Sequence, residues 1–255
     1  MSTRIRHPYL DHPGPIAFAH RGGAADGLEN TVLQFRRAVE AGYRYLETDV
    51  HATRDGRIVA FHDATLDRVT DGAGRIADLP WAEVRRARVA GAEPVPLFEE
   101  LLETFPEVRW NVDLKAESAL HPFLNLIGRT EAWDRVCVGS FSEARVVRAQ
   151  RLAGPRLATS YGTRGVLNLR LRSWGVPAAL RHSAVAAQVP ETQSGIQVVD
   201  QRFVRFAHAR GLQVHVWTIN EAERMHRLLD LGVDGIMTDR IDTLRKVMED
   251  RGVWV

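Results

Sequence analysis

The chain alternates short apolar runs with amphipathic segments along its whole length. The segments at 31–42, 97–105, 143–152 and 243–252 repeat apolar residues at the spacing of a helix. The apolar runs are shorter and are typical of buried strands. Strand-helix alternation repeated about eight times predicts a parallel barrel or a doubly wound sheet. The predicted strands are 16–19, 43–50, 108–114, 136–141, 157–160, 185–189, 214–219 and 235–239.

The barrel is the favoured architecture. A doubly wound dinucleotide fold would carry an early G-x-G-x-x-G, and this sequence has none. A (β/α)8 TIM barrel typically takes about 250 residues, and this chain has 255. Because no Pro/Gly/Ser-rich linker divides the sequence, we expect a single α/β domain over residues 1–255.

Residues 51–96 interrupt the alternation. The segment is much longer than a βα loop, which usually has about 2–6 residues. Its first part, RDGRIVAFHD, is typical of a turn followed by a short strand. We therefore expect a small insertion after the second strand, folded over the C-terminal mouth of the barrel. The turn residues 70–75 at its tip are expected to act as a mobile lid.

The composition is that of a globular protein and excludes several classes. Apolar residues make up 45% of the chain, and no apolar stretch approaches the roughly 20 residues of a membrane span. The formal charge is +2 without a long Lys/Arg block, which argues against a nucleic-acid partner. Cys137 is the sole cysteine, and its apolar surroundings predict a buried thiol. The N-terminus lacks a signal-peptide core, so we expect a cytoplasmic location; the sequence leaves the oligomeric state open.

Carboxylates occupy alternate positions near the ends of two predicted strands. Glu47 and Asp49 face the same side of the second strand because side chains alternate in β structure. Asp113 and Lys115 repeat this spacing on the third strand. Burying adjacent carboxylates without a cation is costly, so the three acids predict a site for Mg²⁺ or Ca²⁺. The alternative for Glu47 and Asp49 is an ion pair with arginines. Lys115 is expected to contact a phosphate oxygen, and its alternative role is to neutralise Asp113 as a structural pair.

Two histidines end predicted strands, and each is followed by a charged residue. His20 precedes Arg21, and His62 precedes Asp63. Displacement at phosphorus needs a base on the attacking oxygen and an acid on the leaving oxygen, and two histidines can supply both. Arg21 offers a forked donor for phosphate. A lone histidine is more often structural, so the pairing with charged neighbours is what favours catalysis.

Further residues carry weaker signals. Asn30 is expected to cap the first helix, and Glu29 to orient the His-Arg pair that ends the first strand. His51 is either a supporting residue of the acidic strand or a surface residue. Trp217 is expected to form an apolar wall for the substrate, with core packing as the alternative. The segment 161–183 is expected to cover the barrel, with a specificity pocket or a membrane contact as alternatives.

The wording and order of these residues resemble the glycerophosphodiester phosphodiesterase family. The matching segments are AFAHRGG (17–23), LENT (28–31), YLETDVHATRDG (45–56), FHDATLDRVTDGAG (61–74), NVDLK (111–115), VHVWTIN (214–220) and GVDGIMTD (232–239). The resemblance implies a barrel with a small insertion, and many family members carry Glu where this chain has Asp113. That difference leaves the metal distance and preference open. The resemblance implies catalytic roles for His20, His62, Arg21 and Lys115, metal binding by Glu47, Asp49 and Asp113, and substrate contacts by Arg21, Lys115 and Trp217.

Together these features predict a metal-dependent phosphodiesterase that cleaves glycerophosphodiesters to sn-glycerol 3-phosphate and an alcohol. Whether water or the glycerol 2-hydroxyl attacks first stays open. One alternative is a phospholipase D-type enzyme on lysophospholipids; the toxins of that type are disulfide-bonded, which a single cysteine argues against. The other is a catalytically idle phosphate-binding barrel, which would be expected to have lost a carboxylate or a histidine.

Overall fold

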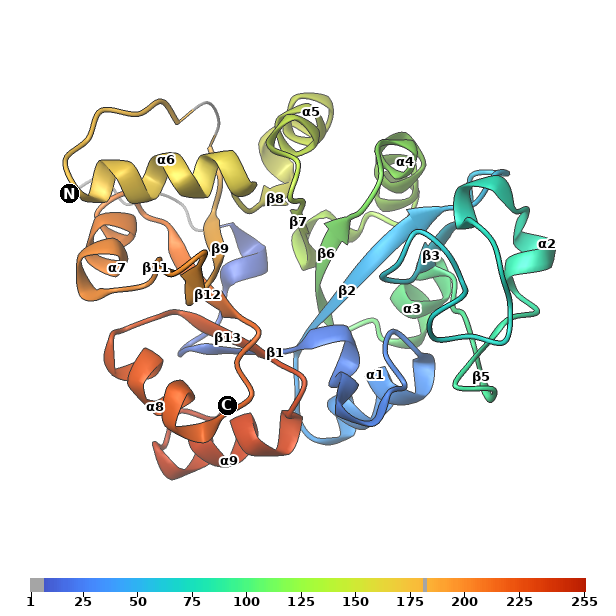
Figure 1. Cartoon of the computed structure of the whole chain (residues 1–255), viewed down its shortest axis with the longest axis horizontal. Helices are drawn as coiled ribbons and strands as arrows, with labels where there is room; N and C mark the ends of the chain where they lie inside the picture. The colour runs from blue at the N-terminus through green and yellow to red at the C-terminus, as the bar shows by residue number, and fades with distance from the viewer. Residues whose placement is uncertain (1–6, 181–182) are drawn as a thin grey trace.

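The computed structural model describes residues 7–180 and 183–255. In this part of the chain, eight parallel strands form a barrel with helices around it (Figure 1). The barrel strands are β1 (Ile16–Ala19), β2 (Tyr45–Ala52), β6 (Arg109–Leu114), β7 (Val136–Gly139), β8 (Ala158–Thr159), β9 (Ala186–Pro190), β12 (Gln213–Trp217) and β13 (Gly235–Thr238).

The strands pair in the order β8-β7-β6-β2-β1-β13-β12-β9. The ring closes between β8 and β9, where Ser160 pairs with Ala186 in parallel. The amide of Tyr161 also donates to the carbonyl of Ala186 at 3.1 Å. The predicted (β/α)8 TIM barrel is therefore confirmed.

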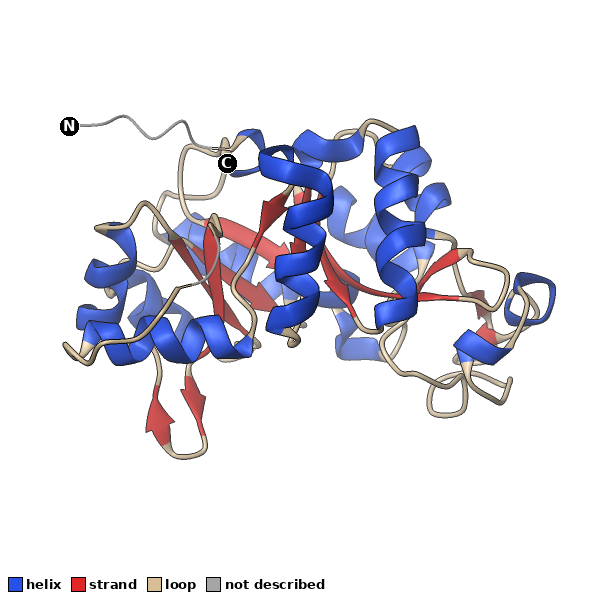
Figure 2. Ribbon diagram, turned by 90° about the horizontal axis from the view of Figure 1, so that it is seen from above, coloured by secondary structure: helices blue, strands red, loops and turns tan. Residues whose placement is uncertain are grey.

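A helix follows each barrel strand and lies on the outside of the barrel (Figures 1 and 2). These helices are α1 (Val32–Glu40), α3 (Phe98–Thr104), α4 (Leu120–Arg129), α5 (Glu143–Ala153), α6 (Thr163–Ser173), α7 (Gln201–His208), α8 (Ala222–Asp230) and α9 (Ile241–Asp250). Their apolar stripes pack on the barrel; Phe35 and Ala38 of α1, for example, are fully buried. Every strand and helix predicted by range agrees with the structure within two residues at each end.

The interior of the barrel is apolar at its N-terminal end and polar toward its C-terminal end. Tyr9 precedes β1 and packs edge to face on Tyr45, with ring centroids 5.4 Å apart. Cys137 lies in the same apolar cluster, and burial raises the pKa of its thiol, so the predicted buried thiol is confirmed. Nearer the other end, Gln188 donates to Asn111 across the interior at 2.6 Å. The polar side chains therefore gather where barrel enzymes keep their active sites.

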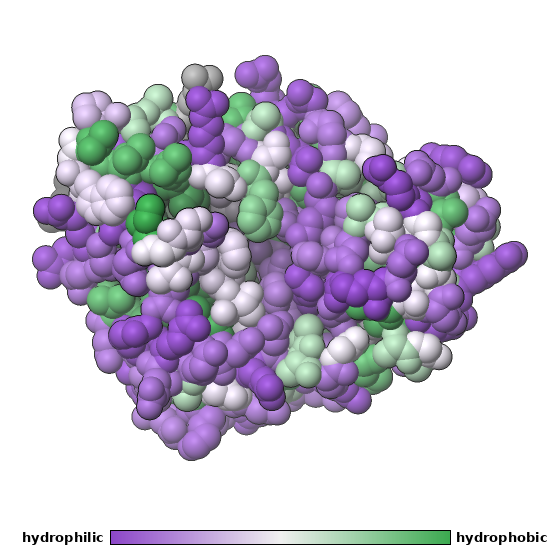
Figure 3. Space-filling model, viewed as in Figure 1, coloured by the Kyte–Doolittle hydropathy of each residue, from purple (hydrophilic) through white to green (hydrophobic). Residues whose placement is uncertain are grey.

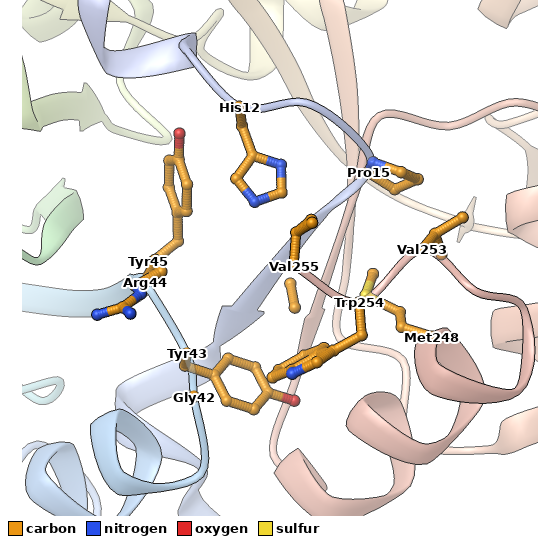
Figure 4. Close-up of a pocket in the computed structure, with 11 residues that line it drawn as sticks. His12, Pro15, Gly42, Tyr43, Arg44, Tyr45, Met248, Val253, Trp254 and Val255 are labelled. Atoms are coloured by element: carbon orange, nitrogen blue, oxygen red, sulfur yellow. The ribbon is translucent and has the colours of Figure 1, made fainter.

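The N-terminal end of the barrel has a small crevice beside the end of the chain (Figure 4). Its walls include His12 and the rings of Tyr43 and Trp254, whose centroids lie 5.1 Å apart. The crevice encloses about 10 Å³, at most the space of a single water molecule. A crevice of this size is too small for a substrate.

The predicted insertion is a small unit with its own apolar core. It contains β3 (Ile58–Ala60), α2 (Trp81–Val84), β4 (Arg88–Val89) and β5 (Glu93–Pro94). Its core includes Phe61, Leu66 and Ile76, all buried. The expected position over the mouth was wrong, because β3 pairs antiparallel with the end of β2 and carries the insertion to the side of the barrel (Figure 1). The mobility of residues 70–75 stays a prediction.

The described part of the segment 161–183 contains α6, which packs on the outside of the barrel, in line with the covering role favoured from the sequence. Leu169 and Arg170 of α6 are buried, and the Arg170 guanidinium pairs with Asp200 at the start of α7, with nearest atoms 2.5 Å apart. Residues 181–182 of this segment, like residues 1–6, lie outside the described residues. In the described ranges, no helix is both long enough and apolar enough to cross a bilayer.

Candidate active site

The predicted site residues meet at the C-terminal mouth of the barrel, the face seen in Figures 1 and 3. Glu47 and Asp49 lie in β2, and Asp49 is in register with Asp113 of β6. His20 directly follows β1, the other neighbour of β2. Because three adjacent parallel strands end at one edge, residues far apart in the sequence become neighbours.

A tight turn after β1 places Arg21 beside the carboxylates. Arg21 has a φ of 51°, and its amide donates to Glu47 Oε2 at 3.1 Å. Gly23 follows with a φ of 93°, where a Cβ would lie only 2.6 Å from Ile241 Cγ2. The glycine is required both for the left-handed backbone and for the close contact with α9.

His20 is held by a carboxylate that the sequence analysis assigned no role. Its Nδ1 lies 2.7 Å from Asp239 Oδ1, directly after β13. Asn220 fixes the second oxygen of Asp239 at 3.1 Å. Burial opposes the protonation of His20, but the charge of Glu47 and the hydrogen bond to Asp239 outweigh it, so the pKa of His20 is raised. This ring can therefore carry a proton near neutral pH.

Lys115 forms ion pairs with two of the three predicted metal ligands. Its Nζ lies 2.7 Å from Asp49 Oδ1 and 2.8 Å from Asp113 Oδ2. Burial opposes the ionisation of Asp49, yet Lys115 and Arg21 outweigh it and lower the pKa of that carboxyl. In the same way, Asp49 and Asp113 raise the pKa of Lys115 against the effect of burial. The ion pair anticipated between Lys115 and Asp113 is confirmed.

Glu47 and Asp113 retain capacity for a cation. Burial, together with the charge of Asp49, raises the pKa of Glu47 to about 7. Among the described residues, Asp113 Oδ1 is buried without a hydrogen-bond partner. Nowhere in these ranges do three His, Cys, Asp or Glu side chains form a ready metal cluster. The metal site predicted at Glu47, Asp49 and Asp113 therefore stays a prediction. In this structure Lys115 is the counter-ion of Asp49 and Asp113.

His62 is anchored by residues of the insertion. Its Nδ1 lies 2.5 Å from Asp63 Oδ1, and Arg68 Nε lies 2.5 Å from Asp63 Oδ2. The hydrogen bond from Arg68 is the main reason that the pKa of Asp63 falls to about 2. Arg68 also reaches Glu29 at 2.7 Å, and Glu29 in turn pairs with Arg21 at 3.2 Å. A series of ion pairs thus connects the insertion to the barrel. The expected contact between Glu29 and Arg21 is confirmed.

Of the weaker assignments, that of Asn30 is corrected and that of His51 is narrowed to one of its two alternatives. The first helix is capped by Thr31, whose Oγ accepts from the amide of Gln34 at 3.2 Å, and not by Asn30. Asn30 has a φ of 58° and turns inward, where its amide donates to Asp49 Oδ2 at 3.3 Å. His51 is not a surface residue, because it is buried and its ring donates to the carbonyl of His62 at 3.1 Å. Burial lowers the pKa of His51, consistent with a neutral supporting ring.

An aromatic pair stands at the rim of the mouth. Trp217, at the end of β12, packs edge to face on Phe141 with ring centroids 5.7 Å apart. Phe141 is nevertheless 62% exposed, and Lys115 Nζ lies 5.7 Å from the centroid of its ring. Trp217 also packs on the inner core of the barrel, which is the alternative anticipated for it, and its role as an apolar wall for the substrate stays a prediction. Phe141 was missed because it follows its strand in an apolar run without a polar signal.

Comparison with known proteins decides the family. Residues 20–243 match the model of the glycerophosphoryl diester phosphodiesterase family. The chain belongs to this family. It is 43% identical over 251 residues to a probable glycerophosphodiester phosphodiesterase 2 of Mycobacterium tuberculosis, covering 96% of this chain and 95% of the relative.

Two further similarities extend this result. A human lysophospholipase D is 27% identical over 271 residues, covering 91% of this chain and 85% of the relative. The structure of an Oleispira antarctica phosphodiesterase in complex with the product sn-glycerol-3-phosphate is 24% identical. Its TM-score of 0.78, over 92% of this chain and 97% of that one, shows the shared barrel fold.

Proposed function

We propose that the protein hydrolyses glycerophosphodiesters to sn-glycerol 3-phosphate and an alcohol, with a divalent cation at Glu47, Asp49 and Asp113. The observation that carries the proposal is the hydrogen bond of 2.7 Å between His20 and Asp239, beside that carboxylate cluster. The similarity to the M. tuberculosis relative supports the reaction class. The Oleispira antarctica structure, whose ligand is sn-glycerol-3-phosphate, supports the product.

The three carboxylates fit a hard cation by the chemistry of their donors. Oxygen ligands suit Mg²⁺ or Ca²⁺, and Asp113 Oδ1 is buried among the described residues without another partner. Burial and the charge of Asp49 raise the pKa of Glu47 to about 7, which supports placing a further positive charge beside it. The cation would supply Lewis-acid polarisation of a phosphate oxygen. Lys115 would then be available to contact the phosphate.

The two histidines fit the roles of acid and base. Asp239 holds Nδ1 of His20, and Asp63 holds Nδ1 of His62. In each ring the carboxylate fixes one nitrogen and leaves Nε2 directed elsewhere, which is the arrangement proton transfer to a substrate oxygen requires. Nε2 of His20 lies on the carboxylate side of the mouth, 3.8 Å from Glu47 Oε2. Arg21 and Lys115 would share the negative charge that develops on the phosphate.

Lysophospholipid hydrolysis is a second candidate. The exposed Phe141 at the rim and the 27% identity to a human lysophospholipase D favour it. An idle phosphate-binding barrel is not favoured, because the histidines and carboxylates are retained and oriented by hydrogen bonds. The cytoplasmic location expected from the sequence stays a prediction.

A substrate panel tests this proposal. Glycerophosphocholine, glycerophosphoethanolamine and lysophosphatidylcholine would be incubated with the purified protein in Mg²⁺ or Ca²⁺, and released sn-glycerol 3-phosphate and alcohol would be quantified. We expect turnover of both glycerophosphodiesters with release of sn-glycerol 3-phosphate. Turnover of lysophosphatidylcholine alone would favour the second candidate. No turnover of any substrate with either cation would refute the proposed hydrolase activity.

A further inference from the structure

The mouth of the barrel is divided into a charged side and an apolar side. The residues of the candidate active site come from the ends of β1, β2, β6 and β13, which are consecutive in the sheet, and from the insertion. The segments that follow the other strands expose large apolar side chains. Of the seven such side chains that are exposed in the described ranges, five come from these segments: Phe141, Leu167, Trp174, Val176 and Ile196.

Helix α6 is apolar on two faces. Its inner face is buried through Gly165 and Leu169. On its outer face, Leu167, Leu171 and Trp174 follow one another at spacings of four and three residues, so they form one stripe. Leu167 is 55% exposed and Trp174 is 42% exposed. A surface helix normally presents polar residues outward, so this stripe marks an interaction surface.

The stripe lies at the mouth end of the molecule. Helices α4 and α5 run along the barrel, whereas α6 lies crosswise to them, level with the mouth (Figures 1 and 2). The hairpin of β10 (Thr192–Gln193) and β11 (Ile196–Gln197) projects from the same end, and its Ile196 is exposed. Figure 3 shows apolar side chains gathered over α6 on this face. The stripe and the hairpin therefore share one face.

The apolar surface is held in place by contacts behind it. The guanidinium of the buried Arg170 lies over the Trp174 ring, 4.3 Å from its centroid. The chain then folds back along α6, where the side-chain amide of Asn168 donates to the carbonyl of Ala179 at 2.7 Å. Val176 lies in this turn and is exposed. A partner that covers this surface would therefore need to order little of the chain.

The side of the barrel that carries the stripe is strongly basic. Residues 144–220 contain eleven arginines, no lysine and only two carboxylates, so their formal charge is +9. Since the whole chain carries +2, the remaining residues carry −7. Both carboxylates of the basic stretch are engaged, Glu191 with Arg224 and Asp200 with Arg170. This asymmetry would turn the stripe toward a negatively charged surface.

Arginines border the stripe and the neighbouring helix. Arg164 lies one turn before Leu167 on the outer face of α6, and Arg172 lies near the end of the helix. Arg202 and Arg205 are exposed on α7, which packs beside α6. Among the described residues, none of these four guanidinium groups forms an ion pair with a carboxylate. Guanidinium groups bind phosphate with two hydrogen bonds at once, so lipid phosphates would supply the counter-charge.

We propose that Leu167, Leu171, Trp174 and Val176, the α6 patch, dock reversibly on a bilayer that contains anionic lipids. The apolar stripe would enter the interface while the bordering arginines contact lipid phosphates, as in an interfacial amphipathic helix. A second copy of the chain fits this face less well, because pairing the face with itself would bring its arginines together. The inference does not rest on the proposed function. Docking would turn the mouth toward the lipid surface.

Flotation of the full-length protein with lipid vesicles tests the proposal. Vesicles of phosphatidylglycerol mixed with phosphatidylcholine are compared with vesicles of phosphatidylcholine alone, at low and at high NaCl. We expect the wild type to bind the anionic vesicles, and to bind less at high salt or without phosphatidylglycerol. Leu167→Asn should weaken binding to the anionic vesicles about tenfold, since it removes apolar area from the interface. Arg164→Gln should weaken it about fivefold.

Two exposed residues away from the patch give matched controls. Leu152 is 50% exposed in the last turn of α5, at the end remote from the mouth, so Leu152→Asn should bind like the wild type. Arg36 is exposed on α1, on the other side of the barrel, and Arg36→Gln controls for the loss of one charge in Arg164→Gln (Figure 1). Hydrolysis of the water-soluble aryl substrate bis(p-nitrophenyl) phosphate should be the same in all four variants, which shows that each is folded.

The outcomes separate docking from catalysis. A wild type that does not float with anionic vesicles would overturn the proposal, as would equal losses in Leu167→Asn and Leu152→Asn. Equal binding to neutral and anionic vesicles would also overturn it. A dimer in analytical ultracentrifugation that Leu167→Asn dissociates would assign the patch to a second copy of the chain instead. A wild type that binds anionic vesicles but hydrolyses neither the aryl substrate nor glycerophosphocholine would refute the proposed function and leave the docking surface standing.

Discussion

His20 and Asp239 join the first and last strands of the barrel through a hydrogen bond of 2.7 Å between Nδ1 and Oδ1. The two residues are 219 positions apart in the sequence, yet β1 and β13 are paired neighbours in the sheet. Asn220, which follows β12, holds Asp239 from the other side. The orientation of a predicted catalytic ring therefore depends on three strands that only the closed barrel brings together.

Asp239→Asn should lower kcat by about tenfold to hundredfold, less than the 10²–10⁴ expected for loss of His20 itself. The amide keeps the size of the side chain but removes the carboxylate that, together with Glu47, raises the pKa of His20. The limb of the pH-rate profile assigned to His20 should therefore move to lower pH. Asp234→Asn is the matched control, because Asp234 pairs with the surface ring of His208 at 2.7 Å. An unchanged profile in Asp239→Asn would refute the positioning role.

His20 and His62 should differ in their dependence on the leaving group. The histidine that acts as acid is needed for an alkoxide but not for p-nitrophenolate, which leaves unaided. Replacing the acid by Ala should cost about 10²–10⁴ in kcat on glycerophosphocholine and much less on the aryl substrate, while replacing the base should slow both. Steady-state kinetics of His20→Ala and His62→Ala on the two substrates distinguish these cases. Equal losses on both would favour a shared role in phosphate binding.

Chelation should abolish activity. The three neighbouring carboxylates pair with Lys115, with Arg21 and, at 3.8 Å, with His20, and Asp113 Oδ1 has no hydrogen-bond partner among the described residues. We expect EDTA to stop turnover and Mg²⁺ or Ca²⁺ to restore it, and Asp113→Ala to weaken cation binding measured by calorimetry. Asp113→Glu should keep part of the activity because it preserves the ligand. Full activity after exhaustive chelation would contradict the metal site.

Arg68→Lys should slow catalysis although Arg68 lies in the insertion. Its guanidinium contacts Asp63 at 2.5 Å and Glu29 at 2.7 Å, and a lysine cannot form this forked pair. Asp63 would then hold His62 less firmly, and we expect kcat to fall about tenfold with little change in KM. Arg54→Lys, elsewhere in the insertion, serves as the control. Among the described residues, the side chain of Arg54 hydrogen-bonds only the carbonyl of Asp78. Equal effects of the two changes would mean that Arg68 acts only on stability.

His215 should make folding stability sensitive to acid. Full burial lowers its pKa from 6.5 to about 3, so the unfolded chain binds a proton that the folded chain excludes. The contribution of the buried, neutral His215 to the free energy of unfolding is fully present above the pKa that this histidine has in the unfolded chain. It falls as the pH drops from about 6.5 toward 3, and the loss is about 2 kcal/mol at pH 5. Urea unfolding at pH 7.5 and pH 5 should show a smaller pH difference for His215→Gln than for the wild type. His121→Gln, at an exposed site of α4, should leave the difference unchanged.

The sequence predicted features that depend on the pattern within a single strand or helix. It missed contacts that form only when the strands close into a barrel. Strand periodicity placed Glu47, Asp49 and Asp113 on one face, because alternation is a property of each strand alone. The contact of Asp239 with His20 depends on the pairing of β13 with β1, which no local pattern encodes. The inward turn of Asn30 depends on a left-handed backbone and on Asp49, so its short polar side chain was mistaken for a helix cap.

The division of the mouth has a consequence for how such an enzyme can diversify. Apart from Asp239, the proposed reacting groups are encoded between residues 20 and 115, whereas the aromatic pair at the rim is encoded later, at Phe141 and Trp217. We therefore expect mutations in the later stretch to alter the range of alcohols accepted while the proposed reacting groups stay unchanged. A directed-evolution library restricted to the later stretch would explore substrate range while the bond-breaking chemistry is inherited intact.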